Sequence, residues 1–277
     1  MMNRRTKAKL LKALITLPAY MTAVLLVGII AYILITGIPS LKPGMFAWKY
    51  TSENVSMMPA IINTVSITLI AMLISIPVSI GSAVFLTEYS RHGSGVVKLI
   101  RLASDTLSGI PSIVYGLFGY LFFDVFLKWG YSILSGSFTL AIMILPLIQR
   151  TAEEAILAVP DSYREGSYGL GAGKTRTIFR IVLPTAMPGI LSGVILGVGR
   201  IIGETAALIY TAGTVAGLAS SLMSSGRTLS VHMYALMSEG LHMEEAKGVA
   251  VVLLAVSLLL NMLSSFIASR IGDNING

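Results

Sequence analysis

The chain has 277 residues, of which 55% are hydrophobic and only 12% are charged, and its mean hydropathy is +0.81. Soluble domains carry about 25% charged residues, so this composition excludes an ordinary soluble protein and favours one bundle of membrane helices. The absence of cysteine excludes disulfides and thiolate metal sites. The net charge of +7 would fit nucleic-acid binding, unless the positions of the charges explain it otherwise.

Six apolar segments are long enough to cross a membrane, at about 20 residues per span. They cover approximately residues 13–37, 60–86, 106–127, 137–157, 187–213 and 248–269. The basic stretch 1–12 resembles the start of a signal peptide, but the following segment is too long for a signal-peptide core and lacks a convincing cleavage site. We therefore expect an all-α integral membrane protein with six transmembrane helices. Residues 1–12 form a cytoplasmic N-terminus and residues 13–277 a single transmembrane domain.

Lysine and arginine are distributed unevenly between the two sides of the predicted spans. With residues 1–12 inside, fourteen of the twenty basic residues fall on that side, five fall on the other, and Arg200 falls within a span. Cytoplasmic loops of membrane proteins carry such an excess. We therefore expect both termini in the cytoplasm, and charge sorting explains the basic net charge without a nucleic-acid partner.

The outer loop, about residues 214–247, begins with glycine- and serine-rich turns and continues as an amphipathic stretch, 228–241. Such a stretch is expected to lie along the membrane surface. His92, His232 and His242 fall in predicted loops without metal-ligand spacing, so we expect solvated histidines and no metal site.

The inner loop, residues 158–184, is polar at first, is interrupted by glycines, and resumes as a basic amphipathic helix. This pattern predicts a short helix, a turn and a second helix outside the membrane, with Pro184 ending the second helix. Residues 171–175 resemble the end of a P-loop. However, Tyr168 stands where the motif requires a glycine and no strand precedes it, so we expect no nucleotide binding. From the pattern alone, the loop is either a solvated connector or a lever between two membrane helices.

A set of positions in this loop resembles the EAA loop of binding-protein-dependent ABC importer permeases. The matching residues are Glu165, Gly166, Ser167, Gly171, Ile181, Leu183 and Pro184. Glycine and serine stand where the usual pattern has two alanines. Residues 107–119, 145–154 and 200–206 are also similar to the PstA-type permeases of phosphate importers. The resemblance runs from about residue 63 through the sixth span, and only the outer loop matches loosely.

The resemblance implies a type I ABC importer permease-like bundle that passes inorganic phosphate across the bacterial cytoplasmic membrane. It implies that the inner loop docks into a groove on a separate ATPase subunit, with Glu165 at the contact and Gly171 at the turn. The implied partners are a PstC-type permease chain, an ATPase dimer, an extracytoplasmic phosphate-binding protein and membrane lipid. The chain itself would be a transporter subunit and no enzyme, without a cofactor.

Other functions stay open at this point. The nearest is a permease for another oxyanion, such as sulfate, molybdate or phosphonate. From different classes come an ATP-independent channel and an intramembrane enzyme, although the sequence lacks paired intramembrane aspartates, a Ser/His pair and an HExxH helix.

Arg200 and Glu204 lie in the middle of the predicted fifth span, where a central arginine costs roughly 2.5–3.5 kcal/mol on insertion scales. At about 100° per residue, both share a face with Gly189, Gly193 and Gly197, so we expect them to point into the bundle or a subunit interface. One interpretation is a structural ion pair. The other, which the resemblance favours, is that Arg200 donates hydrogen bonds to a phosphate oxyanion and Glu204 orients the guanidinium.

Overall fold

The computed structural model describes residues 4–90 and 94–276, and this part of the chain contains helices and turns but no β-strand. The long helices are α1 (Arg4–Gly37), α2 (Met58–Val84), α5 (Ile133–Leu157), α8 (Leu183–Ile202) and α11 (Met243–Asn276). The shorter helices are α3 (Gly95–Ser108), α4 (Ser112–Gly119), α6 (Asp161–Gly169), α7 (Lys174–Thr177), α9 (Ala206–Thr211) and α10 (Leu229–Glu239). The 3-10 turns are η1 (Ile38–Ser40) and η2 (Pro43–Phe46), and the π-helical segments are η3 (Phe85–Tyr89), η4 (Tyr120–Phe126) and η5 (Ile178–Val182).

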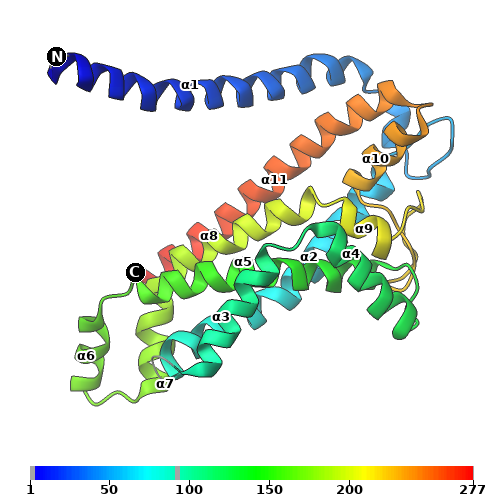
Figure 1. Ribbon diagram of the computed structural model, residues 1–277. Helices are drawn as coiled ribbons and strands as arrows, with labels where there is room; N and C mark the ends of the chain where they lie inside the picture. Colours follow the sequence, from blue (N-terminus) through cyan, green and yellow to red (C-terminus); the bar gives the residue numbers. More distant parts are fainter. Residues whose placement is uncertain (1–3, 91–93, 277) are drawn as a thin grey trace.

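Helix α5 forms the centre of the bundle and packs against α2 and α8, with α4 and α9 at its outer part and α11 along α8 (Figure 1). Its apolar side chains at helical spacing, including Leu140, Ile144 and Ile148, are fully buried. Membrane helices associate mainly through such close packing, because lipid tails are as apolar as the side chains. Helix α5 is therefore the scaffold on which α8 is positioned.

The glycines of α8 allow a close approach to α5. A Cβ atom added at Gly193 would lie 2.8 Å from the Cβ of Thr151, and one added at Gly189 would lie 2.6 Å from the Cβ of Ala155. Distances this short are clashes, so a larger residue at either glycine would push the two helices apart. The small-residue face predicted on this helix is thus its packing face toward α5.

Within residues 4–90 and 94–276, five helical segments are long and apolar enough to cross a membrane. They are Lys12–Ser40, Met58–Tyr89, Ile133–Leu157, Lys174–Ile202 and Met243–Arg270. A bent pair, Gly95–Ser108 and Ser112–Phe126, counts as a sixth candidate, and its two helices differ in direction by 104°. The predicted all-α membrane protein is confirmed, with six spans if the bent pair forms one of them.

The predicted third span, 106–127, is not one continuous helix. Helix α3 ends at Ser108, the chain turns, and α4 begins at Ser112. Pro111 explains the break, because proline lacks an N–H donor and disfavours the helical conformation of the residue before it. The bend therefore lies within the predicted span, and α3 is a separate helix at the inner end of the bundle.

The predicted fifth span, 187–213, does not coincide with one helix. Helix α8 ends at Ile202, and residues 203–205 form a turn before α9. At the other end, Lys174–Ile202 is one continuous helical segment, so Pro184 does not end the second helix of the inner loop. The π-helical segment η5 ends two residues before this proline, so the helical hydrogen-bonding pattern changes close to the position where the N–H is missing.

The predicted amphipathic stretch 228–241 forms helix α10, and its position along the membrane surface stays a prediction. Thr228 caps the helix and Gly240 ends it with φ +72°. Helix α10 packs against α2, α9 and α11, which buries Leu236 and also His232, the latter predicted to be solvated. The polar character of His232 therefore did not indicate that its side chain is exposed. His242 is partly exposed, and His92 lies outside the described residues.

Helix α1 stands apart from the bundle over most of its length (Figure 1). It meets α11 near its C-terminal end, where Gly37 packs against the backbone of Lys247. Large apolar side chains along α1, such as Leu17, Val24 and Ile35, are exposed. In a membrane, lipid or another subunit covers such a surface.

Candidate functional site

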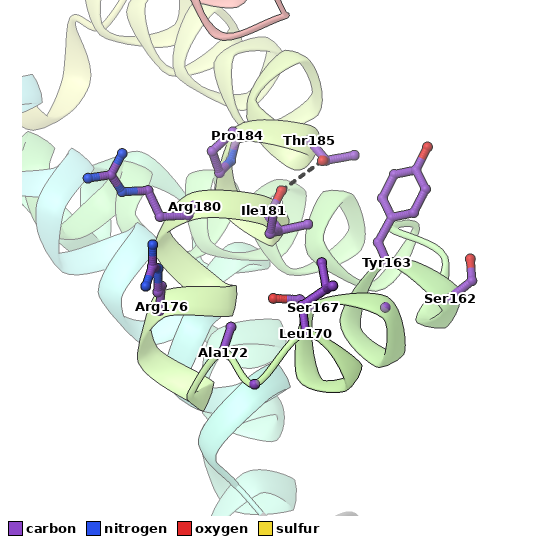
Figure 2. Close-up of a pocket in the computed structure, with 12 residues that line it drawn as sticks. Ser162, Tyr163, Ser167, Leu170, Ala172, Arg176, Arg180, Ile181, Pro184 and Thr185 are labelled. Atoms are coloured by element: carbon purple, nitrogen blue, oxygen red, sulfur yellow. Dashed lines mark hydrogen bonds between the residues drawn. The ribbon is translucent and has the colours of Figure 1, made fainter.

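The inner loop folds into α6, a glycine turn and the start of the Lys174–Ile202 segment, and these parts enclose an open groove of about 700 Å³ (Figure 2). Five of the seven residues predicted for the coupling loop line the groove: Gly166, Ser167, Gly171, Ile181 and Pro184. Glu165 is exposed on α6 outside the groove lining. Leu183 packs against a cluster of buried side chains at the inner end of the bundle. The loop therefore has an ordered shape.

The turn of the groove is fixed by hydrogen bonds and by one glycine. Gly171 has φ +79°, in the left-handed region that favours glycine. The backbone N–H of Ala172 donates to the Ser167 carbonyl oxygen at 3.1 Å, and the Ser167 hydroxyl lies 2.8 Å from the Thr177 hydroxyl. Ser167 thus holds both sides of the turn together.

A buried ion pair attaches α6 to the rest of the bundle. The Arg164 guanidinium donates to Glu88 Oε1 on η3 at 2.7 Å and 3.0 Å, and both side chains are largely buried. The same guanidinium donates to the carbonyl oxygens of Ile156 and Val159 at 3.0 Å and 2.7 Å. In the sequence, Arg164 is only one of several charges in the inner loop, because a partner 76 residues away gives no local signal.

Large apolar and basic side chains are exposed around the groove. Leu170, at the tip of the turn, is 91% exposed, and Tyr163 and Phe179 are exposed as well. Arg176 and Arg180 project from the opposite wall of the groove (Figure 2). Exposed apolar side chains beside charged ones are typical of protein-binding surfaces. The chemistry of this surface suits a protein partner with an apolar pocket and acidic residues around it.

The P-loop-like residues make contacts within the chain. Lys174 Nζ lies 5.1 Å from the centroid of the Tyr89 ring, and Thr175 Oγ1 lies 3.4 Å from the Tyr89 hydroxyl. Tyr89 belongs to η3, at the inner end of the second span. The lysine and the threonine therefore connect the start of α7 to the bundle.

Arg200 lies in the last turn of α8, and its side chain is exposed. The helical angles predicted that Arg200 shares a face with Gly193 and Gly197. These two glycines are buried against α5, whereas Arg200 is exposed, so the predicted common environment is not found. Among the described residues, its guanidinium makes no ion pair. The chain thus presents an exposed cation at the end of a membrane helix.

Glu204 does not pair with Arg200 in the described part of the chain. Because α8 ends at Ile202, a spacing of four residues here no longer corresponds to one helical turn. Glu204 Oε1 instead accepts a hydrogen bond from the backbone N–H of Ala207 at 3.1 Å. The predicted ion pair is therefore absent from the described residues, Glu204 caps the first turn of α9, and its role in orienting Arg200 stays a prediction.

Comparison with known proteins gives a consistent result. The family described as binding-protein-dependent transport system inner membrane component matches residues 75–276. The chain is 32% identical to the probable ABC transporter permease protein YqgI of Bacillus subtilis over 98% of both chains. It is 36% identical to the phosphate transport system permease protein PstA of Pasteurella multocida, over 76% of this chain and 75% of that protein.

Two solved structures share the fold at low sequence identity. A chain of a bacterial alginate ABC transporter, solved in complex with an alginate pentasaccharide-bound periplasmic protein, superimposes with a TM-score of 0.71, 16% identity and 96% coverage of each chain. A chain of the MetNI methionine ABC transporter superimposes with a TM-score of 0.63 and 17% identity, over 79% of this chain and 95% of that one. The fold is that of a type I ABC importer permease, and the chain belongs to the binding-protein-dependent family of multi-pass inner-membrane transport permeases.

Proposed function

We propose that this chain is the permease subunit of an ATP-driven importer that carries inorganic phosphate into the bacterial cytoplasm. The observation that carries the proposal is Arg200, an exposed guanidinium at the end of a membrane helix without an ion-pair partner among the described residues. The 36% identity to a phosphate permease over three quarters of the chain supports phosphate as the cargo.

The chemistry of Arg200 suits a phosphate ion in transit. A guanidinium is planar, stays charged at any physiological pH, and donates two parallel hydrogen bonds to an oxyanion. An arginine at membrane depth is costly unless it faces water, a cavity or a partner. In this proposal the exposed face of Arg200 borders a pathway between this chain and a second permease chain of the PstC type. Glu204 stabilises the turn after Arg200 by accepting a hydrogen bond from the backbone N–H of Ala207.

The groove formed by α6 and the following helix is the proposed docking site for one subunit of an ATPase dimer. Leu170 at its tip and Arg176 and Arg180 on its wall supply apolar and cationic contacts. The excess of basic residues in the inner loops supports the orientation, with both termini and the groove in the cytoplasm. An extracytoplasmic phosphate-binding protein would deliver the ion at the opposite side, as the alginate transporter is accompanied by a periplasmic protein.

A continuous helix connects the two proposed sites. Arg200 lies sixteen residues beyond Pro184 on the Lys174–Ile202 segment, which is roughly 24 Å at 1.5 Å per residue. Closure of the ATPase dimer on ATP would move the groove, and this segment would carry the movement to the anion pathway. The chain itself breaks no bond, because ATP hydrolysis occurs in the partner subunits.

An uptake assay in cells or proteoliposomes tests the cargo and the role of Arg200. Arg200→Met should lower phosphate uptake at least tenfold, because a charge-assisted pair with the anion is lost, whereas Arg200→Lys should retain part of it. Assembly with the partner subunits is measured in parallel. Full uptake in the Met variant would sink the proposed role, and uptake blocked equally by sulfate or molybdate would redirect the proposal to another oxyanion.

Co-purification tests the docking site. Glu165→Gln should weaken recovery of the ATPase subunit, because Glu165 is an exposed carboxylate beside the groove. Glu239→Gln is the control, since it removes the same charge from an exposed position of α10, at the opposite end of the bundle. Equal recovery in both variants would argue against a contact at Glu165. Phosphate flux without ATP or ATPase would instead favour a channel.

A further inference from the structure

A buried polar cluster lies at the end of the bundle opposite the groove, between the segment 47–57 and α10 (Figure 1). Its cation is Arg227, which is 4% exposed and whose guanidinium carbon lies 4.9 Å from the centroid of the Tyr50 ring. Nε and Nη2 of Arg227 have no hydrogen-bond partner, and no carboxylate of the described residues lies within 4.0 Å of the guanidinium. Buried arginines are normally paired with an anion.

A buried histidine adds hydrogen-bonding capacity beside this arginine. His232 is 0% exposed and its ring meets the Tyr50 ring edge to face at 6.2 Å. Neither ring nitrogen makes a well-aligned hydrogen bond within the described residues, and the backbone of Val55 is a polar neighbour of the ring. Burial and the nearby charge of Arg227 lower the pKa of His232 to about 3. The ring is therefore neutral at physiological pH and offers one N–H donor and one acceptor.

The start of α10 belongs to the same cluster. Arg227 directly precedes Thr228, the N-cap of this eleven-residue helix, and the hydroxyls of Thr228 and Ser230 lie 3.0 Å apart. A helix N-terminus carries a partial positive charge and favours anions. The N–H groups of Leu229 and Val231 already donate to the hydroxyls of Thr64 and Thr228, so the helix end adds its partial positive charge to the donors of Arg227 and His232. No carboxylate of the described residues supplies a counter-charge.

We propose that Arg227, with His232 and the N-terminus of α10, binds a small tetrahedral oxyanion before that ion reaches Arg200. The proposal rests on the function proposed above, since it takes the cargo to be an oxyanion such as phosphate. The two sites are also connected through the backbone. The Ser230 hydroxyl donates to the carbonyl oxygen of Glu204 at 2.6 Å, so the helix that begins at the outer site contacts the turn that follows Arg200.

The site is covered in this structure by the segment 47–57. Tyr50 lies against the guanidinium, and the backbone of Val55 lies beside the imidazole. Val55 has φ +44°, a conformation that is unfavourable for a β-branched residue and that marks strained segments near functional sites. Access of the ion therefore requires this segment to lift, which would also relieve the strained backbone.

Equilibrium dialysis tests the site with radiolabelled inorganic phosphate and the purified permease–ATPase complex, prepared without the binding protein. The Arg200→Met background removes the other proposed anion contact. We expect saturable binding that sulfate displaces and chloride does not. Adding Arg227→Met should weaken this binding at least tenfold, since a charge-assisted hydrogen bond to the anion is lost. Lys49→Met is the matched control, because it removes an exposed positive charge from the covering segment and should leave binding unchanged.

Three results would overturn the proposal: no saturable binding in the Arg200→Met complex, affinity unaffected by Arg227→Met, or equal displacement by chloride. If Arg227→Met does not assemble, Arg227→Lys replaces it, because lysine keeps the charge but loses the two-pronged geometry. The Arg227→Lys complex should then assemble normally and bind phosphate more weakly. An unchanged affinity for phosphate in this variant would contradict the proposed site. The function proposed above is tested separately by phosphate uptake in the Arg200→Met single variant, so the two failures can be distinguished.

Discussion

One wall of the groove and Arg200 lie on the same continuous helical segment, Lys174–Ile202, but their contacts with the rest of the chain differ. At the groove, Arg164 and Ser167 make close hydrogen bonds to other elements, and the ion pair with Glu88 is largely buried. At the other end, Arg200 is exposed and makes no ion pair within the described residues. The inner end is thus completed by this chain, whereas the charge of Arg200 at the other end stays open to solvent, an ion or another chain.

The largest effect is expected from Arg164→Met. The substitution leaves the Glu88 carboxylate buried without its partner, and breaking a buried ion pair from one side costs roughly 3–5 kcal/mol. The variant should unfold at a clearly lower temperature in detergent and should lose the ATPase subunit in co-purification, because α6 is no longer attached to η3. Arg200→Met is the comparison, and its thermal stability should change little.

The double variant Arg164→Met with Glu88→Leu separates the two roles of the arginine. Replacing both partners of a buried pair by apolar residues is often close to neutral, so stability should largely return. If the double variant is as unstable as the single one, the bonds of Arg164 to the carbonyl oxygens of Ile156 and Val159 carry the stabilisation instead. An unaltered melting temperature in Arg164→Met would contradict the attachment altogether.

Gly171→Ala should have the next largest effect. The glycine has φ +79°, and a residue with a Cβ atom loses roughly 1–2 kcal/mol in this conformation. Gly169→Ala is the matched control, since Gly169 lies at the end of α6 without a positive φ and with open space around its Cα. Thermal unfolding and ATPase recovery are measured for both. Equal behaviour of the two variants would show that the turn does not depend on the left-handed conformation.

The sequence carried more information about the groove than about the Arg200 segment. The glycines and the spacing in residues 165–184 are local signals, and they predicted a helix, a turn and a second helix correctly. The continuation of that helix through Pro184 was missed, because the adjustment by η5 is a property of the whole helix in its packed environment. The six apolar segments were likewise recognisable from length and hydropathy alone.

The features that escaped prediction depend on distant contacts or on helix ends. Arg164 pairs across 76 residues with Glu88, and His232 is buried by elements that a single segment cannot reveal. The position of Glu204 depends on whether α8 continues for two more residues, and helix ends are the least certain part of any pattern. The predicted angle between Arg200 and Glu204 assumed 100° per residue, and this value does not apply beyond Ile202, where α8 ends.

Variants of Glu204 test the C-terminal end of α8, where Arg200 is exposed. Glu204→Ala removes the side-chain acceptor for the Ala207 N–H, which should cost about 1 kcal/mol, as the loss of a helix cap typically does. Glu204→Gln keeps an acceptor oxygen but removes the charge, so it should retain most of the stability and of the phosphate uptake. Equal loss of uptake in both variants would show that the negative charge, and hence an interaction with Arg200, matters after all.

Ser167→Ala should have the smallest effect. It tests whether Ser167 contacts the ATPase subunit or only stabilises the turn. The Thr177 hydroxyl keeps its bond to the Gly173 carbonyl oxygen at 3.2 Å, so no buried group is left unpaired and the cost should be about 0.5–1 kcal/mol. Ser162→Ala is the control, because Ser162 also lines the groove but lies at the start of α6, away from the turn. A lower melting temperature only in Ser167→Ala, with ATPase recovery unchanged in both, would assign Ser167 to the turn. Loss of the ATPase at unchanged stability would instead make it a contact residue, and the inner end of the helix would then be less self-sufficient than its hydrogen bonds indicate.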